Sequence, residues 1–92
     1  MFKVLVTSKQ GKKRPRRQVS NDTFSTIQEA RAFIDLSISR QEALCWRAWG
    51  LCDVQQQRDG LQEDPRRVVV VYRPALVLVD SLVQTFTIQE AA

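Results

Sequence analysis

The chain has 92 residues, a length that suits one domain with a single thin core. Hydrophobic residues make up 43% and charged residues 26%, values that exclude global disorder and a collagen-like fibre. Fourteen Lys and Arg against ten Asp and Glu give a net charge of +4, and histidine is absent. Because histidine is the commonest general base and the commonest metal ligand, its absence argues against hydrolytic or metal chemistry.

The charge is distributed unevenly along the chain. Residues 1–20 carry seven Lys and Arg and no acid, whereas the remaining 72 residues carry seven Arg and all ten acids, a balance of −3. A basic segment on a slightly acidic body indicates a polyanionic partner. The first twenty residues are therefore the first place to look for a binding site.

The beginning of the chain is predicted to form a β-hairpin. Residues 2–8 alternate between apolar and polar side chains well enough for a strand. Gly11 and Pro15 then interrupt regular structure, and a weaker strand follows over residues 18–24. We expect the basic loop, residues 9–17, to lie at the tip of this hairpin.

A helix is predicted over about residues 27–42. Thr26 and Glu29 have the spacing of a capping box, in which each side chain bonds to a backbone amide near the other. Apolar residues then recur at steps of three and four, which places them on one helical face; they are Ile27, Ala30, Phe33, Ile34 and Ile38. The pattern weakens beyond this point, so the helix is expected to end between Ser39 and Cys45.

Strands are predicted over about residues 46–89. Residues 46–57 alternate as a strand does, although this stretch is ambiguous. Residues 68–72 are β-branched and apolar on both faces, which is typical of a well-paired strand. Residues 82–88 form the last strand, and residues 75–83 remain open between strand and helix.

These elements predict an α+β fold within one domain, residues 1–92. The architecture is an antiparallel β-sheet with one helix packed on a face, in the order ββαβββ. The ten acids are scattered along the chain, and the three glycines are too dispersed to form a phosphate-binding loop. We therefore expect no enzymatic activity, no cofactor and no metal site.

The two cysteines and two tryptophans each leave alternatives open. Cys45 and Cys52 have no partners for zinc, and two free thiols are favoured over a disulfide. In a strand, Trp46 and Trp49 would point to opposite sides, so that an exposed Trp49 beside Arg47 would suit base stacking or a protein interface. The alternative is that both rings fill the core.

The basic loop is the clearest functional signal. Six cations lie within nine residues, and such clusters bind phosphates because each contact releases a counterion and arginine can bind a phosphate with two hydrogen bonds. The predicted binding residues are Lys9, Lys12, Lys13, Arg14, Arg16 and Arg17, with Trp49 added as an aromatic contact. A solvated tip that only improves solubility is the alternative. The loop does not distinguish RNA, DNA and an acidic protein surface.

The small size, the hairpin–helix–sheet order and the loop of residues 11–17, Gly-Lys-Lys-Arg-Pro-Arg-Arg, resemble the phage-encoded anti-CRISPR proteins. The resemblance covers size and architecture along the whole chain and rests on no shared motif. It implies a stoichiometric inhibitor that docks on an RNA-guided surveillance complex and blocks target DNA. Many members imitate DNA with an acidic face, whereas the basic loop here would suit guide RNA or an acidic protein patch.

Two other classes of protein stay open. One is a general RNA- or DNA-binding accessory module, and the other is a small phage structural or assembly protein that dimerises through a sheet edge at residues 67–73. The first apolar run is too short for a signal peptide, and no apolar stretch is long enough to span a bilayer. We expect a cytoplasmic protein without a membrane partner, and its oligomeric state is left open.

Overall fold

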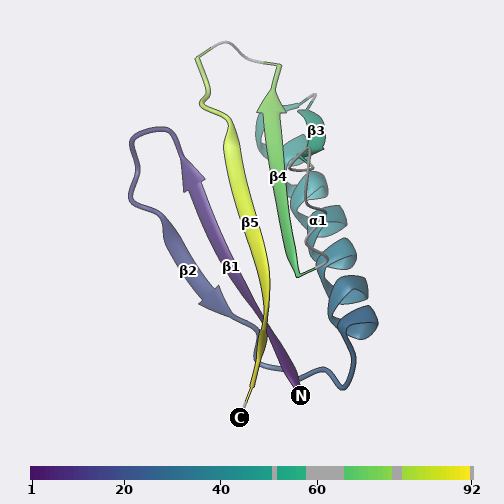
Figure 1. Cartoon of the computed structure of the whole chain (residues 1–92). Helices are drawn as coiled ribbons and strands as arrows, with labels where there is room; N and C mark the ends of the chain where they lie inside the picture. Colours follow the sequence, from purple (N-terminus) through teal and green to yellow (C-terminus); the bar gives the residue numbers. More distant parts are fainter. Residues whose placement is uncertain (51, 58–65, 76–77, 92) are drawn as a thin grey trace.

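The computed structural model describes residues 1–50, 52–57, 66–75 and 78–91 (Figure 1). Its elements are β1 (Phe2–Gln10), β2 (Arg16–Val19), α1 (Ile27–Trp49), β3 (Cys52–Gln57), β4 (Arg67–Pro74) and β5 (Leu82–Glu90). One helix packs against a five-stranded antiparallel sheet whose strand order is β2-β1-β5-β4-β3. The predicted α+β class and the order ββαβββ are both confirmed.

The first and last strands pair along their whole length. β1 and β5 are in register from Phe2 opposite Glu90 to Gln10 opposite Leu82, so the two ends of the chain lie side by side (Figure 1). β5 is the central strand, and β2 and β3 are the edges. The suggestion of a sheet edge at residues 67–73 is wrong, because β4 is paired with β3 on one side and with β5 on the other.

The predicted start and buried face of the helix are confirmed. The Glu29 amide donates to the Thr26 hydroxyl at 3.1 Å, and the Glu29 carboxylate accepts from the Ser25 amide at 3.0 Å. Ala30 and Ile34 are fully buried on the face that meets the sheet. The helix is thus fixed at its first turn by local hydrogen bonds and along its length by apolar packing.

The helix is longer than predicted and includes both tryptophans. It continues to Trp49 and ends at Gly50, whose φ of 74° only glycine adopts readily and whose amide donates to the Trp46 carbonyl at 3.0 Å. The strand interpretation is therefore wrong for residues 46–50, residue 51 lies outside the described part of the chain, and β3 begins at Cys52. Burial of Cys45 extends the apolar face by two further turns, which favours continuation of the helix.

The second strand needs correction, and the segment left open between strand and helix is neither in its described part before β5. The second strand is Arg16–Val19 and not residues 18–24, because the chain leaves the sheet at Ser20, whose hydroxyl accepts from the Val4 amide at 3.0 Å. Within residues 75–83, the described residues before β5 lie in bends, turns and irregular backbone, so they are neither strand nor helix. Residues 76–77 lie outside the described part of the chain.

The core lies between α1 and the helix-facing side of the sheet. Its largest fully buried side chains are Tyr72, Phe86, Ile34, Val4 and Val70. Among the described residues, the polar side chain of Gln84 is buried with them and accepts from the Tyr72 hydroxyl at 2.9 Å. In the part of the chain that the structure describes, no helix combines the length and the apolar character needed to span a membrane.

Candidate nucleic-acid interface

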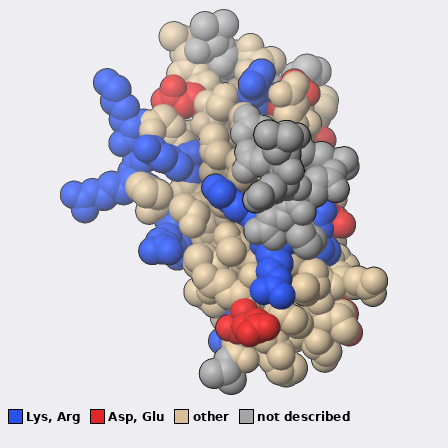
Figure 2. Space-filling view, viewed as in Figure 1, with Lys and Arg blue, Asp and Glu red and all other residues tan. Residues whose placement is uncertain are grey.

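The β1–β2 hairpin carries all six cations that the sequence predicted as a binding site. All six are exposed to solvent. Lys12, Lys13 and Arg14 lie in the connection between the strands, Lys9 lies in β1, and Arg16 and Arg17 begin β2. Figure 2 shows Lys and Arg projecting on the left of the molecule, where Figure 1 draws the hairpin. The predicted loop over residues 9–17 is thus too long, because Lys9, Arg16 and Arg17 belong to strands.

The strand register directs the two arginines of β2 to opposite sides of the sheet. Arg16 is paired with Ser8, whose hydroxyl accepts from the Gln84 amide at 3.2 Å. Gln84 also donates to Gln41 of α1 at 3.4 Å, so Ser8 and Arg16 lie on the side that faces the helix. Arg17 follows in the strand and lies on the opposite face. The hairpin therefore presents cations in two directions.

The turn at the hairpin tip is anchored to the body of the protein. Gly11 has a φ of 57°, and the Lys13 amide donates to the Gln10 carbonyl at 3.1 Å, which closes the turn. The Gln10 side chain donates to the Asp80 carbonyl at 2.9 Å, and a Cβ on Gly11 would meet the Asp80 carboxylate. These contacts fix the base of the turn, so the cations that follow project from a defined position.

The hairpin cations have no acidic partner among the described residues. None of them forms an ion pair there, although Asp80 lies next to Gly11. Because no acid in the described residues is paired with them, these cations attract counterions from solvent, which a polyanion can displace. This is the electrostatic condition that phosphate binding requires.

The face opposite the helix carries two of the predicted cations, Lys9 and Arg17, and three that the sequence did not single out, Lys3, Arg67 and Arg73. Alternation along β1 and β4 places Lys3, Lys9, Arg67 and Arg73 there, together with Arg17. Among the described strand residues on this face, the acid is Asp53, which is opposite Arg73. A period-two count along the predicted strands would have found only Lys3, because the other four cations lie just outside the predicted strand limits.

Trp49 does not join the basic cluster. It is partly buried and packs against the hydrophobic core, whereas Trp46 is 48% exposed. Trp49 ends α1 just before β3, while the basic turn leads into β2, and β2 and β3 are the two opposite edges of the sheet. The assignment of Trp49 to the same binding site as the loop is therefore not supported by its position.

The Cys52 thiol and the Tyr72 hydroxyl are held in their protonated forms. Cys45 and Cys52 are free and buried. Burial, and to a lesser extent the neighbouring Cys45 thiol, raise the pKa of the Cys52 thiol to about 11, so its nucleophilic thiolate is disfavoured. Burial also raises the pKa of Tyr72. Among the described residues, no three His, Cys, Asp or Glu side chains come together as metal ligands.

Comparison of the chain with protein-family models, with curated proteins and with solved structures gave no match.

Proposed function

We propose that the protein is a small non-enzymatic binding protein that docks on nucleic acid, free or within a nucleoprotein complex, through its basic hairpin. One observation carries this proposal: six exposed cations on one hairpin have no ion-pair partner in the described chain, and no acid occurs in residues 1–20. If the hairpin served only to keep the protein soluble, a mixture of positive and negative side chains would do so equally well.

The chemistry of the hairpin suits the phosphate backbone. Lysines at the turn act as mobile point charges, while the arginines can each hold a phosphate with two hydrogen bonds. Their contacts release condensed counterions and so favour binding without reading sequence. Because the hairpin cations are interleaved with no aromatic residue, the hairpin itself has no platform on which to stack a base.

The resemblance to anti-CRISPR proteins suggests a narrower version of the same proposal. In that version the partner is an assembled RNA-guided complex, and the hairpin contacts guide RNA or an acidic protein patch so that target DNA is blocked. Free oligonucleotides would then bind far more weakly than the assembled complex. A cytoplasmic location is part of the proposal, since a reducing compartment keeps the two buried thiols free.

Titration of labelled RNA and DNA of mixed sequence tests the proposal directly. Replacing Lys12 and Arg14 together by Gln should weaken binding at least about tenfold, equivalent to about 1.4 kcal/mol. The matched control replaces Arg31 and Arg47 of α1 by Gln, which removes the same charge away from the hairpin. We expect this control to bind nearly as the native protein does.

Equal losses in both variants would show that net charge alone matters, and the hairpin would not be the site. Affinity capture from host lysate with and without nuclease then separates free nucleic acid from a nucleoprotein partner. A protein partner that survives nuclease treatment would support the narrower version.

A further inference from the structure

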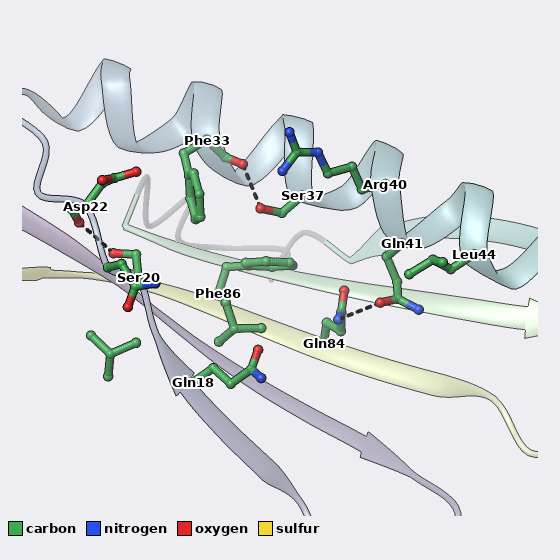
Figure 3. A pocket seen from close by; sticks show the side chains of 13 residues that line it. Gln18, Ser20, Asp22, Phe33, Ser37, Arg40, Gln41, Leu44, Gln84 and Phe86 are labelled. Atoms are coloured by element: carbon green, nitrogen blue, oxygen red, sulfur yellow. Dashed lines mark hydrogen bonds between the residues drawn. The ribbon is translucent and has the colours of Figure 1, made fainter.

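A polar-rimmed cleft of about 650 Å³ lies between α1 and the strands β1, β2 and β5 (Figure 3). The helix side contributes Phe33, Ser37, Arg40 and Gln41, and the sheet side contributes Gln18 of β2 among others. Its volume falls within the range of small-molecule binding sites, about 300–1,000 Å³. The cleft thus offers more room than a packing defect does.

The floor of the cleft is aromatic. The ring of Phe33 projects from the helix toward the sheet, and Phe86 of β5 lies below it (Figure 3). Phe33 is partly buried, with its ring centroid 5.1 Å from that of Phe24, whereas Phe86 is almost completely buried. Phe33 therefore offers the ring surface that an occupant can reach.

Several polar groups around this floor have hydrogen-bonding capacity to spare. The side chains of Gln18, Asn21 and Arg40 form no hydrogen bond or ion pair with the described part of the chain. The Gln41 amide nitrogen reaches only the Cys45 sulfur, at 3.6 Å. Ser37 donates to the Phe33 carbonyl at 2.9 Å and keeps its lone pairs as acceptors. The cleft therefore holds unused donors and acceptors beside an aromatic ring.

The cleft also lies on the same side of the sheet as one hairpin cation. Gln18 is opposite Val6, which packs against the core, so Gln18 faces the helix. Arg16 precedes it by two residues and faces the same way. A polyanion bound at Arg16 would therefore pass beside the mouth of the cleft.

We infer that the cleft receives one unstacked base of a single-stranded nucleic acid whose backbone is held by the hairpin, an inference that rests on the proposed function. Phe33 stacks on the base, the amides of Gln18 and Gln41 meet its hydrogen-bonding edge, and Arg40 meets a phosphate. Asp22, the one acid among the lining residues, accepts from an exocyclic amino group. Duplex bases cannot enter, because they remain stacked and paired.

A base-binding cleft and charge alone predict opposite preferences between single-stranded and duplex nucleic acid. A purely electrostatic site prefers a duplex, because each phosphate contact contributes about 0.9 to the log–log salt slope for a duplex and about 0.7 for a single strand. A base-accepting cleft prefers the single strand. Fluorescence titration of a short single strand, its duplex and an abasic strand of equal length therefore measures the inference, and we expect the single strand to bind tightest.

Two variants and one control connect this preference to the cleft. Phe33→Leu keeps an apolar side chain and removes the stacking ring, and Gln18→Ala changes an exposed residue without touching the core. Each should weaken single-strand binding roughly 5- to 100-fold, with Phe33→Leu at the larger end, and leave duplex binding unchanged. Gln28→Ala, on the exposed surface of α1 outside the cleft, should change neither.

The outcomes distinguish failure of base binding in the cleft from failure of nucleic-acid binding by the hairpin. If the native protein binds the duplex or the abasic strand as tightly as the normal single strand, or if Gln18→Ala is silent, the cleft does not accept a base and the proposed hairpin function stands. If neither strand form binds, both the hairpin function toward free nucleic acid and the cleft are overturned.

Discussion

At the scale of single residues, Gly11 is fixed by both its backbone and its surroundings. Its φ of 57° is unfavourable for other residues, and an added Cβ would meet the Asp80 carboxylate. We expect Gly11→Ala to lower the free energy of unfolding by about 1–2 kcal/mol in chemical denaturation. When Asp80 is also replaced by Ala, the clash between the added Cβ and the carboxylate disappears. The loss of stability caused by Gly11→Ala should then fall to the contribution of the unfavourable φ alone. An identical cost in both backgrounds would contradict the contact.

The pKa of the Cys52 thiol predicts how stability depends on pH. Because burial raises this pKa from 9.0 to about 11, the folded state keeps a proton that the unfolded state loses. Stability from this group is complete below pH 9 and is lost as pH rises toward 11, by up to about 2 kcal/mol. Tyr72 adds a similar loss only above its ordinary pKa of 10.

Chemical denaturation between pH 9 and 10 measures how much Cys52 contributes to the pH dependence of the free energy of unfolding. Cys52→Ala should remove most of the slope in this window, although its stability at neutral pH will be lower because the side chain is buried. An unchanged slope in the variant would show that another group is titrating.

At the scale of secondary-structure elements, the buried face of α1 predicts contrasting effects for two neighbouring positions. Ile34 is fully buried, whereas Leu36 is 50% exposed on the same helix. Ile34→Ala should lower the free energy of unfolding by about 2–5 kcal/mol, and Leu36→Ala by well under that. Thermal or urea unfolding of the two variants measures this, and equal sensitivity would mean that the helical phase is wrong.

A helix or strand could be predicted from the sequence where neighbouring residues alone determine its position. The capping residues Thr26 and Glu29 and the apolar spacing after them identify the helix without tertiary information. The end of the helix could not be placed, because alternation and helical periodicity both fit residues 46–49 and packing against the core decides between them. The short β2 strand was also misplaced, since its limits depend on pairing with β1.

At the scale of the whole molecule, sequence reasoning identified the hairpin cations but not their directions. Charge clustering is visible in a linear sequence, whereas the opposite orientations of Arg16 and Arg17 follow only from strand register. The cleft could not be predicted either, because Gln18, Phe33 and Phe86 belong to three separate elements that meet only in the folded protein. Trp49 was assigned to the site on the strand interpretation, whereas the alternative of core packing is the one that fits its place at the end of α1.

The salt dependence of nucleic-acid binding measures whether the hairpin cations contact phosphates. If about three phosphates are contacted by the hairpin, the logarithm of the association constant should fall with the logarithm of salt concentration at a slope near −2 to −3. Replacing Arg14, Arg16 and Arg17 by Gln should reduce the affinity and flatten this slope. Replacing them by Lys keeps the positive charges and should retain much of the affinity. A slope that is the same in the native protein and the Gln variant would contradict binding through the hairpin.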